Sequence, residues 1–81
     1  MLPFDVDRAR IDVSKHFRNT WMRKWGWDHV DLREALREAY RATKSGKDKW
    51  EVFVRRKGSK KLILVHEAGT NEVFVITGAE G

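Results

Sequence analysis

Residues 50–77, WEVFVRRKGSKKLILVHEAGTNEVFVIT, decide the fold that we expect for this chain. Apolar, β-branched and aromatic residues gather in three short segments of this stretch, and polar or turn-forming residues separate them. The dipeptides Gly58-Ser59 and Gly69-Thr70 suit two-residue hairpin turns that begin with glycine. We therefore predict three antiparallel strands joined by two tight turns: Trp50–Arg56, Leu62–Val65 and Val73–Thr77.

Two-residue turns would fix the register of these strands, because residues at equal distances from the turn then face each other. A turn at Gly58-Ser59 places Glu51 opposite His66. A turn at Gly69-Thr70 places Val65 opposite Phe74. The other predicted pairs are Lys57 with Lys60, Val54 with Ile63, Leu64 with Val75, and Leu62 with Thr77.

Side chains alternate between the two faces of a strand, so this register gives the sheet two unlike faces. The apolar face would collect Val52, Val54, Ile63, Val65, Phe74 and Ile76. The opposite face would collect Glu51, Phe53, Arg55, Leu62, Leu64, His66, Val73, Val75 and Thr77. We expect helices to cover the first face and to leave the second face open.

Two amphipathic helices are predicted before the strands. The first begins at Ser14 as its N-cap, runs to about Trp25 and stops at Gly26, which suits a left-handed C-terminal residue. The second begins at Asp31, with Glu34 three positions later in the manner of a capping box. Their apolar stripes are Val13, Phe17, Trp21 and Trp25 in the first, and Leu32, Ala35, Leu36, Ala39 and Tyr40 in the second.

These elements predict one α+β domain over residues 1–81, with two N-terminal helices packed on one face of a three- to four-stranded antiparallel sheet. Residues 1–13 lead into the first helix, either as an irregular segment or with a short strand at Ile11–Val13. Thr43–Lys49 is expected to be a polar loop between the second helix and the strands.

Composition restricts the kinds of site that the chain can carry. It has 81 residues, no cysteine and three histidines, so no disulfide or thiolate metal site is available, and the scattered histidines do not form a zinc signature. We therefore expect neither a metal nor a cofactor. No apolar stretch approaches the roughly 20 residues that span a bilayer, and the N-terminus lacks the pattern of a secretory signal. We expect a cytoplasmic location without membrane contact.

The basic residues outnumber the acidic ones by 17 to 12, which gives a net charge of +5, and they gather in residues 15–25 and 55–61 without any acid. Such patches suit a polyanion such as RNA, and they also occur on soluble surfaces that bind none. The candidate nucleic-acid-binding residues are His16, Arg23, Phe53, Arg56, Lys57, Lys60, Lys61 and Thr77.

The predicted open face also suggests a catalytic hypothesis. Cleavage of RNA needs a base, an acid and a cation near the phosphate. Glu51 and His66 could supply the base and the acid, and Arg55 could hold the phosphate while Phe53 stacks on a nucleobase. A Glu opposite a His is also a common cross-strand pair with a structural role, and that alternative stays open.

The chain resembles the small RelE-like and BrnT-like toxin superfamily. The matching stretches are Ser14-Lys15-His16, Met22–Gly26, Asp31–Leu36, the strands at Trp50–Arg56 and Leu62–Val65, and Val75-Ile76-Thr77. The resemblance implies helices that back one sheet face, while the other face meets and cuts RNA. It also implies a partner antitoxin protein that neutralises the toxin.

Three functional hypotheses follow from the sequence. The first is a toxin-like, metal-independent ribonuclease that uses His66, Glu51 and Arg55. The second is a non-catalytic nucleic-acid-binding domain. The third is a protein-interaction module, because the predicted open face carries enough apolar area for a homodimer or a bound partner helix to cover.

Overall fold

The computed structural model describes residues 2–80, which form a five-stranded sheet and short helices. The elements are β1 (Arg10–Val13), η1 (Phe17–Met22), α1 (Arg23–Trp25), α2 (His29–Arg37), β2 (Arg41–Lys44), β3 (Lys49–Val54), β4 (Lys60–His66) and β5 (Glu72–Glu80). The strand order is β1-β5-β4-β3-β2, with β1 parallel to β5 and the other neighbours antiparallel. The predicted α+β class is confirmed, but the sheet is mixed and has more strands than expected.

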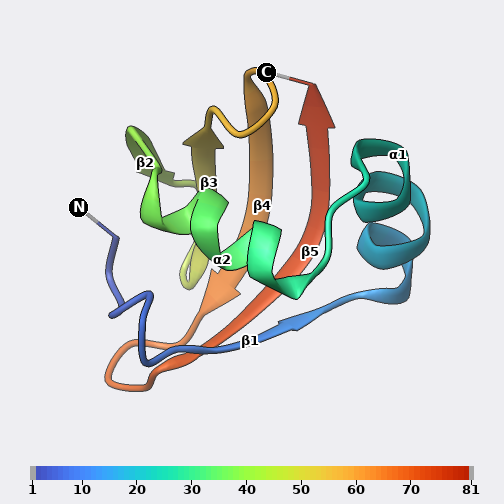
Figure 1. Ribbon diagram of the computed structural model, residues 1–81. Helices are drawn as coiled ribbons and strands as arrows, with labels where there is room; N and C mark the ends of the chain where they lie inside the picture. Colours follow the sequence, from blue (N-terminus) through green and yellow to red (C-terminus); the bar gives the residue numbers. More distant parts are fainter. Residues whose placement is uncertain (1, 81) are drawn as a thin grey trace.

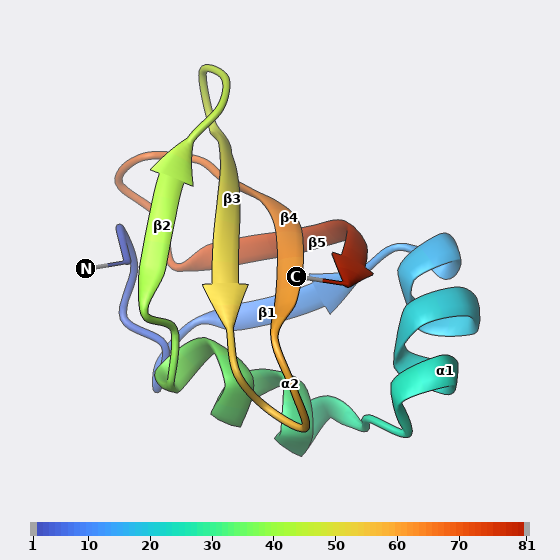
Figure 2. The same ribbon diagram turned by 90° about the horizontal axis from the view of Figure 1, so that it is seen from above.

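The helices lie on one side of the sheet, with α2 in front of β3 and β4 and α1 beside β5 (Figure 1). Seen from above, β1 and β5 run across the direction of β2, β3 and β4, so the sheet is strongly twisted (Figure 2). We call the side toward the helices the helix-covered face and the opposite side the open face.

The core lies between the helices and the helix-covered face. Burial of each large apolar side chain there contributes roughly 1.5–3 kcal/mol to the stability of the fold. The sheet supplies Val52, Val54, Leu62, Leu64, Val73 and Val75, and the helices supply Phe17, Leu32 and Leu36, all of them buried.

The connection between β3 and β4 is longer than predicted, and it changes the register. Val54 pairs with Lys60, so residues 55–59 form the loop, in which Lys57 (φ 57°) and Gly58 (φ 103°) both adopt left-handed conformations. Glu51 consequently pairs with Ile63 and not with His66. The predicted pairs Glu51–His66, Val54–Ile63 and Lys57–Lys60 are therefore wrong.

The register between β4 and β5 is confirmed near the turn and fails beyond it. The predicted pairs Val65–Phe74 and Leu64–Val75 are present. A β-bulge follows, because Ile63 pairs with Thr77 and leaves Ile76 as an extra residue. The predicted pair of Leu62 with Thr77 is wrong for this reason, and Leu62 pairs with Gly78.

The shift between β3 and β4 covers an odd number of residues, so it reverses which side chains of β4 and β5 face the core. Val52 and Val54 are inside, as predicted. Three residues that were predicted on the core side lie on the open face instead: Ile63, Val65 and Phe74. Phe74 is 44% exposed. Five residues that were predicted on the open face are buried instead: Leu62, Leu64, His66, Val73 and Val75.

The first helix has the predicted ends but an unusual middle. The hydroxyl oxygen of Ser14 accepts a hydrogen bond from the backbone N–H of Phe17 at 2.9 Å, and Gly26 ends the helix with φ 69°. Between them, η1 is a π-helix, a wider turn with i→i+5 hydrogen bonds. Ser14 also donates to the carbonyl oxygen of Ile76 at 2.5 Å, which ties the helix start to the bulge in β5.

The second helix begins and ends earlier than predicted. Asp28 is its N-cap and exchanges hydrogen bonds with Asp31, so the capping box is built by Asp28 and Asp31 rather than by Asp31 and Glu34. The helix ends at Arg37, and the backbone N–H of Tyr40 donates to the carbonyl oxygen of Phe53 instead of continuing the helix. The chain then enters β2, which the sequence did not reveal.

Gly78 is the point at which the first helix meets the sheet. A Cβ atom there would lie 2.8 Å from Cη2 of Trp25 and 3.1 Å from Cε1 of Phe17. Only a residue without a side chain lets both aromatic rings pack directly on β5. The short strand considered at Ile11–Val13 is also present, as β1 along the other edge of β5.

Candidate nucleic-acid interface

The proposed catalytic group of Glu51, Arg55 and His66 is not assembled. His66 lies on the helix-covered face, is 4% exposed and packs against the ring of Phe4, with ring centres 5.2 Å apart. Its Nε2 donates to the carbonyl oxygen of Thr70 at 2.6 Å. Glu51 lies on the open face, so the sheet separates the two residues proposed as base and acid.

Two of the predicted nucleic-acid-binding residues have internal roles. Lys60 is 5% exposed, and its Nζ donates to the carbonyl oxygen of Lys57 at 2.5 Å. Arg56 is half-buried and donates to the carboxylate of Asp31 at 2.8 and 3.1 Å. Both cations are thus engaged within the protein, and the structure gives no support to their assignment as phosphate-binding residues.

The pair of Arg56 and Asp31 is an electrostatic link between the β3–β4 loop and the start of α2. The hydrogen bond from Arg56 holds the pKa of Asp31 below its ordinary value, and the backbone N–H of Asp28 acts in the same direction. The same bond raises the pKa of Arg56. Glu38 is a second, longer partner of Arg56 at 3.8 Å.

The remaining candidates fall into two separate groups. His16 and Arg23 are exposed on the first helix. Phe53 and Lys61 lie on the open face as direct partners in β3 and β4, and Lys57 is exposed in the loop at the same end of these strands. Thr77 pairs with Ile63 on that face. The structure therefore brings Phe53, Lys61 and Thr77 onto one surface and leaves His16 and Arg23 on the helix.

Four side chains at one end of the open face form what we call the aromatic–basic patch: Tyr40, Arg41, Phe53 and Arg55. The guanidinium carbon of Arg55 lies 4.1 Å from the ring centre of Tyr40, and that of Arg41 lies 5.4 Å from the ring centre of Phe53. The two rings are 6.4 Å apart and inclined by 48°. Each ring therefore carries a cation, and the two pairs lie side by side.

The patch is accessible and positively charged. Tyr40 is 39% exposed, Arg41 and Arg55 are exposed as well, and Phe53 is half-buried. Lys61 pairs with Phe53 across the strands and lies 3.6 Å from Glu51 through its Nζ. A surface with two aromatic rings and several cations can hold stacked bases and the phosphates that join them.

Sequence reasoning named Phe53, Arg55 and Lys61 but missed Tyr40 and Arg41. In the sequence pattern, Tyr40 continues the apolar stripe of the second helix, and Arg41 falls on the polar face of the same helix. The missed strand carries only one apolar residue, Ala42, among Arg41–Lys44. No alternation of apolar and polar residues was therefore present to reveal it.

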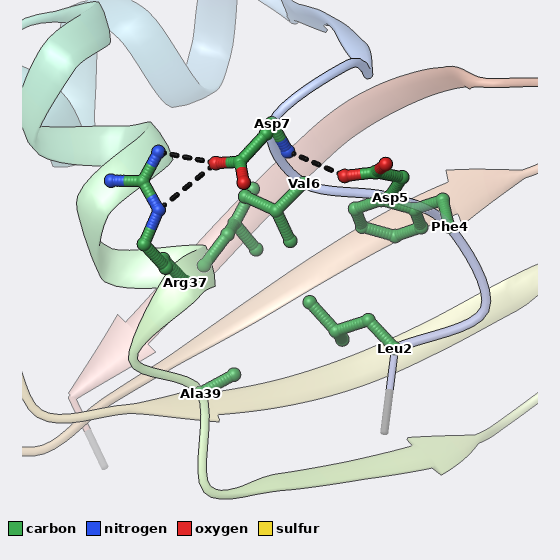
Figure 3. Close-up of a pocket in the computed structure, with 8 residues that line it drawn as sticks. Leu2, Phe4, Asp5, Val6, Asp7, Arg37 and Ala39 are labelled. Atoms are coloured by element: carbon green, nitrogen blue, oxygen red, sulfur yellow. Dashed lines mark hydrogen bonds and ion pairs between the residues drawn. The ribbon is translucent and has the colours of Figure 1, made fainter.

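A pocket of about 310 Å³ lies between the N-terminal segment and α2 (Figure 3). Its charged groups are already paired, because Arg37 donates to the carboxylate of Asp7 at 3.0 and 2.5 Å and also bonds Glu34. The hydrogen bond to Asp7 raises the pKa of Arg37. Asp5, the third charged residue of the wall, accepts a hydrogen bond from the backbone N–H of Asp7 at 3.0 Å and lies 3.8 Å from Arg8. Each charged group of the pocket therefore has a partner within the protein. The other lining residues are apolar: Leu2, Phe4, Val6, Leu36 and Ala39.

Metal-binding clusters and membrane-spanning helices are both absent from residues 2–80. Within this range no three histidine or carboxylate side chains gather closely enough to hold a metal ion. The helices of the same range are all too short or too polar to cross a bilayer.

Comparison of the chain with models of protein families, with curated proteins and with solved structures gave no match in any of the three. The resemblance to RelE-like toxins therefore stays a prediction, and the site itself carries the functional argument.

Proposed function

We propose that this protein binds single-stranded nucleic acid, above all RNA, on the open face of its sheet. The observation that carries the proposal is the pair of adjacent arginine–aromatic contacts, Arg55 on Tyr40 and Arg41 on Phe53. Sheets that bind single strands use exposed rings for the bases and neighbouring cations for the backbone.

Single strands suit this patch better than duplexes. A ring can stack on a base only if the face of that base is free, and in a duplex the neighbouring base pairs cover it. Stacking of one base on an aromatic side chain contributes about 1–3 kcal/mol. Two rings whose centres lie 6.4 Å apart can engage two neighbouring bases of a flexible strand.

The proposed function is binding without strand cleavage. Proton transfer requires an acid and a base within reach of the same ribose and phosphate. His66 is buried and bonded to Thr70, and Glu51 lies on the other face of the sheet. The residues of the catalytic hypothesis thus do not support an RNA-cleaving centre, whereas Arg55 and Phe53 do support binding.

Fluorescence anisotropy with a labelled single-stranded RNA of about ten nucleotides tests the proposal. Phe53 and Phe74 both lie on the open face, but only Phe53 belongs to the aromatic–basic patch. We expect Phe53→Leu to weaken binding roughly tenfold, because it removes one stacking surface. The matched control, Phe74→Leu, should bind as the unchanged protein does.

A duplex of the same sequence should bind more weakly than the single strand. Equal losses in Phe53→Leu and Phe74→Leu would contradict the assigned surface. A failure of the unchanged protein to bind any single strand at low salt would contradict the function itself.

A further inference from the structure

The carboxylate of Glu51 and the ammonium of Lys61 lie beside Phe53 on the open face. Lys61 is the direct cross-strand partner of Phe53, and Glu51 precedes Phe53 by two residues on the same side of β3. The side chains of Glu51 and Lys61 are 35% and 33% exposed, so a molecule seated on Phe53 can reach both. An acceptor and a donor therefore border the ring.

The hydrogen-bonding capacity of this pair is not used within the described part of the chain. Its Oε1–Nζ distance of 3.6 Å is that of an ion pair and exceeds the distance of a normal hydrogen bond. Among residues 2–80 no side-chain hydrogen bond involves either group. Their mutual attraction holds them near each other, while both carboxylate oxygens and the ammonium protons stay available.

We infer that Glu51 and Lys61 read the edge of a guanine that stacks on Phe53, an inference that rests on the proposed function. Guanine presents two neighbouring N–H donors, at N1 and at the 2-amino group, beside the O6 acceptor. The two oxygens of Glu51 accept the two N–H groups, and Lys61 donates to O6. Bidentate contacts of this kind distinguish one base from the others.

The other bases match this arrangement less well. Adenine and cytosine present one amino group beside a ring nitrogen acceptor, which would face an oxygen of Glu51. Uracil presents a single N–H between two carbonyl oxygens. Only guanine offers two adjacent donors to the carboxylate and an acceptor to the ammonium, so the same surface binds strands in general and prefers those with guanine.

Anisotropy titrations with oligouridine strands that carry one central guanosine, inosine or adenosine test this inference. We expect the guanosine strand to bind roughly tenfold more tightly than the adenosine strand. Inosine lacks the 2-amino group and should fall between them. Glu51→Gln keeps the shape of the side chain but has one acceptor oxygen, so it should remove the preference.

Glu72→Gln is the matched control, because it removes one exposed carboxylate from β5 away from Phe53. It should raise the affinity for all strands slightly and keep the ratio between guanosine and adenosine. Equal binding of the three strands by the unchanged protein, or a preference that persists in Glu51→Gln, would overturn the guanine inference and leave the proposed function intact. Absence of binding to every strand would overturn both.

Discussion

The ammonium nitrogen of Lys60 lies 5.3 Å from the ring centre of Trp25, inside the protein. The ring of Trp27 is the second aromatic neighbour, at 6.0 Å. The negative faces of both indoles and the carbonyl oxygen of Lys57 replace the water that a buried ammonium has lost. Lys60 thus connects α1, β4 and the loop that precedes β4.

Truncation of Lys60 should therefore destabilise the fold. We expect Lys60→Ala to lower the free energy of unfolding by about 2–4 kcal/mol, because it leaves a cavity beside the indoles of Trp25 and Trp27. Lys60→Met keeps the length of the side chain and has no charge to desolvate, so it should cost less than about 1.5 kcal/mol.

Urea denaturation measures both values, and Lys47→Ala in the exposed β2–β3 loop should change stability by less than about 0.5 kcal/mol. If Lys60→Ala were as stable as the unchanged protein, the internal role of Lys60 would be refuted.

Gly78 should tolerate no side chain. In Gly78→Ala the new Cβ would meet the ring of Trp25 at 2.8 Å, and either the helix or β5 must move. We expect a loss of about 1–3 kcal/mol, as for other overpacked cores. Thermal denaturation followed by circular dichroism measures it. Gly46→Ala, in an exposed loop, serves as the comparison, and an equal loss there would argue against tight packing at Gly78.

The link between Arg56 and Asp31 should make stability depend on pH in acid. The hydrogen bond from Arg56 and that from the backbone of Asp28 lower the pKa of folded Asp31 below 3.8, so folding favours the carboxylate form. The resulting stabilisation is complete above pH 3.8 and disappears as the pH falls through the lower folded-state pKa.

Asp31→Asn should lose this contribution, and its free energy of unfolding should fall less than that of the unchanged protein between neutral pH and about pH 2. Urea titrations at several pH values measure the difference. Asp12→Asn, at an exposed position, should keep the full decrease. An equally steep decrease in Asp31→Asn would show that the ion pair does not govern acid stability.

Much of the fold could be predicted because local signals coincide with the elements. Ser14 and Gly26 bound the first helix, and three apolar segments separated by glycine-containing turns predicted the meander of β3, β4 and β5. The error in the sheet faces came from one loop. Lys57 adopts a left-handed conformation that is uncommon for residues other than glycine, and no pattern in the sequence predicts this conformation. Because this lengthens the loop, the faces of β4 reverse.

The candidate site depended on that same loop. Once Glu51 pairs with Ile63, His66 turns into the core and leaves the open face. Phe53 and Arg55 keep their predicted surface because the parity of β3 does not change. Tyr40 and Arg41 join them only through the pairing of β2 with β3, a long-range contact that the sequence pattern did not encode.

The salt dependence of RNA binding should show whether Arg55 contacts a phosphate. Each phosphate neutralised on a single strand contributes about −0.7 to the slope of log K against log salt concentration. Arg55→Gln should therefore make the slope shallower by about 0.7. Arg23→Gln, on the first helix, removes an equal charge and should leave the slope unchanged. A shallower slope in Arg23→Gln together with an unchanged slope in Arg55→Gln would place the interface on the first helix instead.

The most direct test of the central claim is a titration of the ¹⁵N-labelled protein with short single-stranded RNA, in which NMR monitors the chemical shifts of the backbone amides. We predict that the largest changes occur in and around the aromatic–basic patch, at Tyr40, Arg41, Phe53, Arg55 and Lys61, with His16 and Arg23 unaffected. Changes concentrated at residues 15–25, or no changes at any position, would contradict nucleic-acid binding on the open face.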